Sequence, residues 1–179
     1  VAKRNIDLHR VSYPSNYINF IREKIKTERH RKNIESESFY LDEIIYFRLA
    51  TSSPFAFYNS TKFKDCKDEV RELINNLNDK KLGQLLHIIS NNSQERVIIF
   101  CEFLNTVEYI RKNIPPGRKI YCISGEVILA RRIELFNQFR NDDTGILILT
   151  SVGSEGIDLQ FCSTVINYDL HWNPVKLIQ

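Results

Sequence analysis

Glycine is scarce in this chain, with six residues in 179, and the spacing of these glycines excludes two common phosphate-binding loops. No two glycines are separated by four residues, so the loop G-x-x-x-x-G-K-S/T is absent. The dinucleotide-binding pattern G-x-G-x-x-G is absent as well. The chain therefore cannot hold a triphosphate by itself in the usual way, although it could supply the second wall of a nucleotide site.

Methionine is absent and the first residue is valine, so we expect this chain to be an excised part of a longer protein. No apolar run approaches the ~20 residues that span a membrane, and no charged-then-apolar leader opens the sequence. We expect no membrane partner. Hydrophobic residues make up 42% of the chain, which is enough to build a core, and the length suits one domain or one domain with an appendage.

Paired metal ligands are also missing from the sequence. The four cysteines (Cys66, Cys101, Cys122 and Cys162) lie far apart without a C-x-x-C pair, and the four histidines are scattered. We therefore predict buried, reduced thiols, no metal site and no catalytic thiol.

Positive charge is concentrated at the start of the chain. The net charge is only +3, but residues 1–32 carry nine Lys or Arg against three acids. A basic segment beside a near-neutral domain suggests an anionic partner. A contact with another domain and a solvated helix face remain alternative interpretations.

The first 75 residues are predicted to be helical and irregular. Helical patterns run over Ile18–Lys26 and from Leu41 toward Leu49, after which Ser52, Ser53 and Pro54 break the helix. Apolar residues then recur with helical spacing from Val70 to Leu77 and from Leu82 to Ile89.

After residue 95 short apolar strands alternate with helices, a pattern typical of a parallel sheet covered on both faces. The predicted strands are Arg96–Phe100, Lys119–Ile123, Gly145–Thr150 and Thr164–Tyr168, with helices over Asn105–Asn113 and Leu129–Phe139. Ligands bind such sheets at the carboxyl ends of the strands. The candidate positions are therefore Phe100–Phe103, Ser124–Gly125, Thr150–Asp158 and Asp169.

The order and spacing of these segments resemble the second RecA-like lobe of superfamily-two helicase-type ATPases. Arg132 and Phe139 follow Gly125 by seven and fourteen residues, as in that lobe. Phe100–Phe103 resembles motif IV of the lobe, and Thr150–Leu159 resembles motif V.

Two further segments are similar to the Swi/Snf-like branch of these ATPases. They are Val165–Pro174, with its Trp-Asn-Pro helix start, and Arg48–Pro54 before the lobe. The sequence Asp158-Leu-Gln160 favours the bacterial polymerase-recycling type of Swi/Snf-like protein. The resemblance covers about residues 40–179.

This resemblance implies an α/β, RecA-like three-layer domain with a mostly parallel sheet, preceded by a helical segment. It implies a helical N-terminal segment (residues 1–75) that belongs to the Swi/Snf-like accessory region. The second RecA-like lobe (residues 76–179) would be truncated before motif VI, of which Gln179 resembles the first residue. No catalytic residue is expected here, because the motif VI arginines lie beyond Gln179.

The implied function is that of the second motor lobe of an ATP-dependent DNA translocase or helicase, a cytoplasmic, nucleoid-associated enzyme. The full-length protein would hydrolyse ATP with Mg²⁺, both bound mainly by the missing first lobe, and this fragment alone would be inactive. The implied partners are the phosphate backbone of duplex DNA and the first RecA-like lobe of the same protein. A remodelled protein complex is a further candidate.

The resemblance also carries residue roles. ATP would be bound by Gly153, Gly156 and Asp158. Nucleic acid would be bound by Cys101, Glu102, Ser124, Gly125, Arg132, Thr150 and Ser151. For Arg132 a second role stays open, in which it pairs with an acid to hold its helix.

The sequence departs from the family pattern at two positions of motif V. Ser154 stands where many Swi/Snf-like proteins have a second glycine, and Ser151 stands where many have lysine. The second change puts one basic contact with nucleic acid in doubt. An RNA helicase lobe and a free-standing α/β domain that binds small molecules remain the alternatives.

Overall fold

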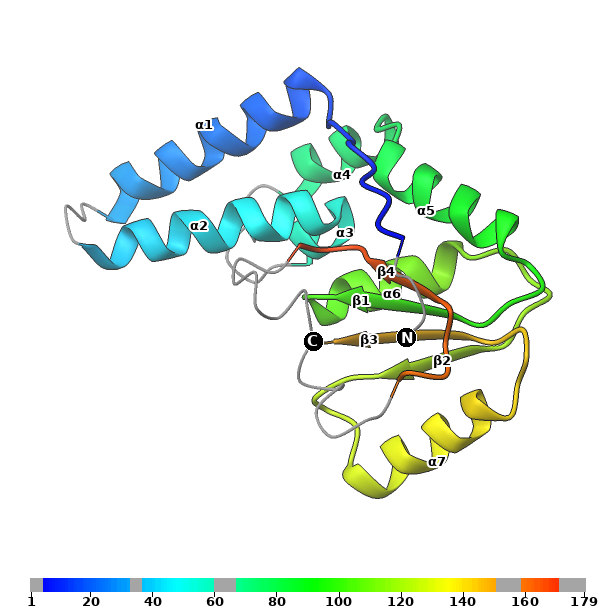
Figure 1. The fold of residues 1–179 in the computed structure, drawn as a ribbon. Helices are drawn as coiled ribbons and strands as arrows, with labels where there is room; N and C mark the ends of the chain where they lie inside the picture. The colour runs from blue at the N-terminus through cyan, green and yellow to red at the C-terminus, as the bar shows by residue number, and fades with distance from the viewer. Residues whose placement is uncertain (1–4, 33–36, 60–66, 151–158, 171–179) are drawn as a thin grey trace.

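A computed structural model describes residues 5–32, 37–59, 67–150 and 159–170 of the chain (Figure 1). Its first half is helical, as the sequence predicts. The helices of this segment are α1 (Ser15–Lys32), α2 (Glu37–Ser52), α3 (Pro54–Tyr58) and α4 (Lys67–Asn75). No helix in these ranges is long and apolar enough to cross a bilayer.

The second half contains a four-stranded sheet whose pairings are all parallel. Its strands are β1 (Val97–Cys101), β2 (Ile120–Ile123), β3 (Ile146–Thr150) and β4 (Thr164–Asn167), in the order β2-β3-β1-β4. The sequence prediction was correct for every one of these strands to within one residue at each end. Every residue of β3 is buried, which explains why the apolar pattern of this strand is continuous rather than alternating.

Helices cover both faces of the sheet, which gives three layers (Figure 1). The helices are α5 (Lys80–Asn91), α6 (Leu104–Asn113) and α7 (Leu129–Arg140). Successive strand residues point to opposite faces, so Ile99 packs in the core that includes α5 and α6, whereas Ile98 packs against Phe139 of α7. The predicted α/β three-layer architecture is thereby confirmed.

The helical segment has an apolar core of its own. Tyr17 and Ile21 of α1 pack with Tyr46 and Ala50 of α2, and the Tyr17 hydroxyl donates a hydrogen bond to the Ala50 carbonyl at 3.0 Å. The segment is therefore a packed unit beside the sheet domain.

One helix of this segment was not predicted. Pro54 ends α2, as expected, but it is also the first residue of α3. Ser53 caps α3, because its hydroxyl accepts a hydrogen bond from the Ala56 N–H at 3.0 Å. The helical stripe expected to reach Leu77 ends earlier, since α4 stops at Asn75.

A single guanidinium holds together the edge of the sheet at which the strands begin. Arg118 precedes β2 and donates hydrogen bonds to the carbonyls of Thr144 at 2.6 Å, Asn92 at 3.2 Å and Ile89 at 3.3 Å. These carbonyls belong to the end of α5 and to the loop before β3. Partial burial lowers the pKa of Arg118 from its ordinary value.

We predict that Arg118→Met lowers the free energy of unfolding by about 2–3 kcal/mol, because the backbone carbonyls that Arg118 contacts lose a charged hydrogen-bond donor. Urea unfolding of the variant beside the parent chain would measure the difference. The control is Arg111→Met, which removes an exposed arginine paired with Glu108 along α6 and should leave the unfolding midpoint unchanged. Equal midpoints for the two variants would contradict the prediction.

Candidate functional site

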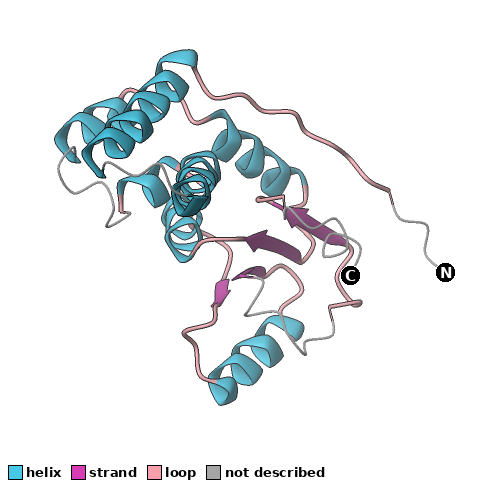
Figure 2. Cartoon of the chain, turned by 90° about the vertical axis from the view of Figure 1, so that its left-hand side faces the viewer, coloured by secondary structure: helices cyan, strands magenta, loops and turns pink. Residues whose placement is uncertain are grey.

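The candidate site lies at the carboxyl edge, by which we mean the edge of the sheet at which its parallel strands end. Cys101 pairs in register with Thr150, and Phe100 pairs with Asn167, so the segments that follow β1, β3 and β4 start side by side. Figure 2 views the molecule from the side of this edge, with α1 and α2 above the strands and α7 below them.

The carboxylate of Asp169 is the centre of the contacts at this edge. Its Oδ2 accepts hydrogen bonds from the Ser52 hydroxyl at 2.7 Å and from the Glu102 N–H at 2.9 Å. Its Oδ1 accepts one from the ammonium of Lys81 at 2.8 Å. The Asp169 side chain is only 8% exposed, and a buried carboxylate requires such partners. The ends of α2, β1 and β4 and the start of α5 therefore meet at one group.

Lys81 is held in place by the local structure of α5. Asp79 caps this helix, because its Oδ1 accepts hydrogen bonds from the N–H groups of Lys81 at 2.9 Å and Leu82 at 3.0 Å. The Lys81 ammonium then donates to the carbonyl of Thr51 at 2.9 Å and lies 4.1 Å from the centre of the Tyr168 ring. A cation at the last carbonyls of α2 also interacts favourably with the helix dipole.

Three buried hydroxyl groups extend this arrangement to α6. The Thr106 hydroxyl lies 2.6 Å from that of Ser52 and 2.9 Å from that of Ser53. We call Ser52, Lys81, Thr106 and Asp169 the Asp169 cluster. Ser52 and Ser53 thus end one helix, begin the next and fasten both to the sheet domain.

Beside the Asp169 cluster, Arg48 of α2 forms an ion pair with Glu102, the residue that follows β1. The two side chains are 31% and 23% exposed, respectively, so the pair borders solvent. Glu102 was predicted to contact nucleic acid. Its carboxylate is paired here with a basic side chain of the helical segment.

The structure brings the described residues of the predicted nucleic-acid site to the same edge. Ser124 and Thr150 are buried and Gly125 is exposed. Cys101 is 3% exposed, and burial raises the pKa of its thiol well above the ordinary value, so this thiol stays protonated within the core. Any contact of Cys101 with a ligand would thus have to use its backbone, and the binding roles of these residues remain predictions.

Arg132 braces the turn between β2 and α7. Its guanidinium donates hydrogen bonds to the carbonyls of Val127 at 2.6 Å and Gly125 at 2.8 Å. Backbone carbonyls are partners that the sequence did not indicate. The contacts hold the turn that carries Gly125, and both roles predicted for Arg132 remain predictions.

Several predicted residues fall outside the described part of the chain. These are the three residues assigned to ATP, Gly153, Gly156 and Asp158, together with Ser151 and the segment 171–179. Their assignments remain predictions. Among the described residues, no group of three His, Cys, Asp or Glu is placed to hold a metal ion.

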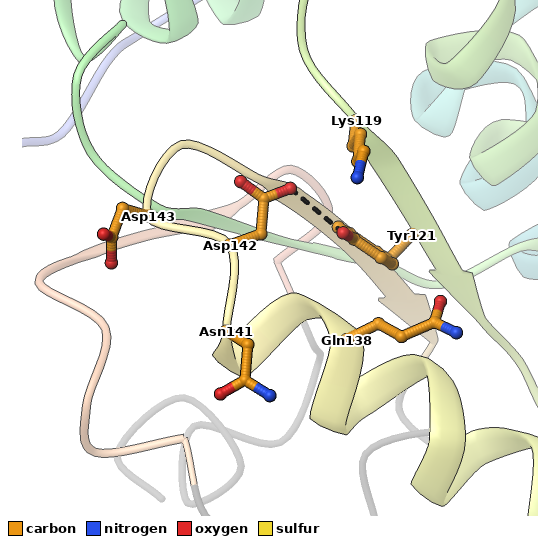
Figure 3. A pocket seen from close by; sticks show the side chains of 6 residues that line it. All are labelled: Lys119, Tyr121, Gln138, Asn141, Asp142 and Asp143. Carbon is orange, nitrogen blue, oxygen red and sulfur yellow. Dashed lines mark hydrogen bonds between the residues drawn. The ribbon is translucent and has the colours of Figure 1, made fainter.

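A hollow on the described surface lies at the opposite edge of the sheet (Figure 3). It has a volume of about 630 Å³ and is lined by Lys119, Tyr121, Gln138, Asn141, Asp142 and Asp143. The Tyr121 hydroxyl donates to Asp142 across its wall at 3.0 Å. Because the hollow adjoins the ends at which the strands begin, it is separate from the candidate site.

Comparison with known proteins identifies the family. Residues 80–179 match the model of the helicase conserved C-terminal domain. The chain belongs to this family. The match begins at the first residue of α5 and includes the whole sheet.

The relatives include helicases named for different nucleic acids. The protein fml2 of Schizosaccharomyces pombe, whose name classes it provisionally as an ATP-dependent DNA helicase, is 30% identical over 152 residues, 74% of this chain and 19% of its own length. The human ATP-dependent RNA helicase DDX55 is 36% identical over 94 residues, 51% of this chain and 16% of its own length. The chain thus spans less than a fifth of the length of each of these relatives.

Solved structures show the same fold. The C-terminal domain of a Sulfolobus solfataricus SWI2/SNF2 ATPase matches with a TM-score of 0.59 at 19% identity, over 89% of this chain and 66% of that one. The C-terminal part of the Fun30 ATPase domain matches with a TM-score of 0.55 at 19% identity, over 90% and 72% of the two chains. The predicted RecA-like fold of a helicase C-terminal lobe is confirmed.

We predict that Lys81→Met lowers the free energy of unfolding by about 3–5 kcal/mol, because it leaves the buried Asp169 carboxylate without its cation. The matched control is Lys80→Met at the adjacent, exposed lysine, which should change little. Combining Lys81→Met with Asp169→Asn should recover part of the loss, since the uncompensated charge is then gone.

Urea unfolding of these three variants and of Asp169→Asn alone would measure these differences. The prediction is wrong if Lys81→Met and Lys80→Met unfold at the same midpoint. It is also wrong if the effects of Lys81→Met and Asp169→Asn simply add in the double variant, because the two residues would then not interact.

Proposed function

We propose that the full-length protein is an ATP-dependent DNA translocase or helicase of the Swi/Snf-like type, and that this chain is its second motor lobe. Membership of the helicase C-terminal domain family supports an ATP-driven function on nucleic acid. The observation that carries the Swi/Snf-like assignment is the likeness to a SWI2/SNF2 ATPase domain over 89% of the chain, which extends beyond the sheet domain into the helical segment.

In this proposal the carboxyl edge faces both ligands. Motif V, from Thr150 onward, would contribute Gly153, Gly156 and Asp158 to an ATP site shared with the first lobe. Ser124, Gly125 and Thr150 would contact phosphates of one nucleic-acid strand. ATP binding would draw the two lobes together and hydrolysis would let them separate, so that the protein moves its contacts along the nucleic-acid strand.

The chemistry assigned to this chain is binding and orientation. Transfer of the phosphoryl group requires positioning and charge stabilisation, which the first lobe, Mg²⁺ and motif VI would supply. Contacts with phosphates predict binding that is salt-sensitive and largely independent of base sequence.

An RNA helicase is the second candidate function. It is favoured by the 36% identity with DDX55, which is named an RNA helicase, over 94 residues that cover about half of this chain. The helical segment argues for the Swi/Snf-like assignment instead, because the SWI2/SNF2 domain is similar over nearly the whole chain.

We predict that duplex DNA stimulates ATP hydrolysis by the full-length protein and that Asp158→Ala reduces the stimulated turnover by at least about tenfold, the effect of losing about 1.4 kcal/mol in the transition state. Steady-state hydrolysis with no nucleic acid, with duplex DNA and with RNA of the same sequence would test this. Asp143→Asn, at the opposite edge of the sheet, is the control and should behave as the parent protein.

Stronger stimulation by RNA than by DNA would favour the second candidate. A protein that hydrolyses ATP equally with and without either nucleic acid would contradict both candidates. We also expect no turnover by the 179-residue chain alone, so hydrolysis by that purified chain would contradict the division of labour between the two lobes.

A further inference from the structure

The ion pair between Arg48 and Glu102 joins the two halves of the chain at the carboxyl edge. Arg48 lies one helical turn before Ser52 on α2, and Glu102 directly follows β1. Thr150 lies on the neighbouring strand, paired in register with Cys101. The basic side chain of Arg48, from the helical segment, is therefore placed near the end of β3, where the proposed nucleic-acid contacts begin.

The guanidinium of Arg48 is suited to hold a phosphate while it keeps Glu102. A guanidinium carries five N–H donors, and one carboxylate accepts hydrogen bonds from at most two of them in a bidentate pair. The other N–H groups can then donate to a phosphate. The Arg48 side chain is 31% exposed, so part of it faces solvent. The planar fork matches phosphate geometry better than an ammonium does.

The Asp169 cluster fixes the position of Arg48. Ser52 bonds to Asp169 at 2.7 Å and to Thr106 at 2.6 Å, and Lys81 bonds to the Ser52 carbonyl at 3.1 Å. These contacts anchor the last turn of α2 against the sheet domain. A side chain that is already oriented loses less conformational entropy when a ligand binds.

The charges at this edge point to the same function. Glu102 and Asp169 adjoin the end of β1, and each would repel an approaching phosphate if it were unpaired. Arg48 is paired with Glu102 and Lys81 with Asp169. Asp169 is enclosed with its lysine, whereas the Arg48 pair borders solvent, so Arg48 is the cation of the two that a phosphate could reach.

We propose that Arg48 binds a phosphate of the nucleic-acid backbone, so that the binding track extends from the RecA-like lobe onto the helical segment. This inference rests on the proposed function, since it requires nucleic acid at the carboxyl edge. Glu102 then acts as a positioning residue that orients the guanidinium. In this proposal the phosphate contact belongs to Arg48, and the contact that the family resemblance implies for Glu102 remains a prediction.

The test measures binding of the full-length protein to a fluorescent DNA duplex, and to RNA of the same sequence, by anisotropy at several salt concentrations. Arg48→Ala should weaken binding about 5- to 10-fold near 0.1 M salt and reduce the slope of log K against log salt concentration by about one. Glu102→Gln should bind as tightly as the parent protein or more tightly, with the same slope, because glutamine keeps an oxygen that accepts from the guanidinium while the negative charge is removed. Arg48→Lys should keep the slope, because it keeps the charge.

The chain offers a matched control pair. Arg111 and Glu108 form an Arg–Glu ion pair on α6, near the helix end that is far from the carboxyl edge. Arg111→Ala and Glu108→Gln should leave both the affinity and the salt slope unchanged. The melting temperature of each variant, measured in parallel, shows whether the protein remains folded, and Arg48→Lys provides a second reading if Arg48→Ala unfolds.

The outcomes separate this inference from the proposed function. If Arg48→Ala and Glu102→Gln weaken binding alike with no change of slope, the pair is only structural and the inference is wrong. The inference is also wrong if Arg48→Ala binds like Arg111→Ala. Failure of the parent protein to bind either nucleic acid would overturn the proposed function itself, whereas an Arg48 effect seen on RNA alone would support the inference and replace DNA as the partner.

Discussion

The arrangement of the two halves of the chain depends on the charge of one carboxylate, Asp169. A carboxylate that is only 8% exposed is unstable without close donors, and the donors come from three separate parts of the chain. Ser52 comes from the helical segment, Lys81 from the first turn of α5 and the Glu102 N–H from the end of β1. Satisfying this one group therefore brings these elements to the same end of β4.

Among the described residues, none of the three apolar clusters includes side chains from both halves of the chain. The helical segment packs around Tyr17 and Tyr46, while the sheet domain has its own clusters on the two faces of the sheet. The halves also meet where the rings of Phe55 and Tyr109 stack with centroids 6.1 Å apart. Hydrophobic contact is non-directional, whereas hydrogen bonds to a fixed carboxylate require particular angles and distances. We infer that the Asp169 cluster sets the orientation of the helical segment on the lobe.

The sheet could be predicted from the sequence because its signal is local. A run such as Ile98 and Ile99, with one side chain in each core, shows directly that both faces of the strand are covered. The rule that ligands bind at strand ends also identified Asp169 as a candidate position. The partners of Asp169 could not be predicted, because Lys81 and Ser52 lie 88 and 117 residues away and no local pattern records such contacts. Pro54 concealed α3, since the same residue ends one helix and begins the next.

The chemistry of the carboxyl edge bears on the choice between DNA and RNA. The groups proposed to bind are a turn at Gly125, hydroxyl groups such as that of Thr150, and the guanidinium of Arg48. All of these recognise phosphate oxygens, which DNA and RNA share, whereas the 2′-hydroxyl is the group that distinguishes the two. Relatives named for DNA and for RNA both match this lobe. We therefore expect the lobe to bind the phosphate backbone without distinguishing DNA from RNA. Contacts made outside the carboxyl edge would then determine which nucleic acid is bound.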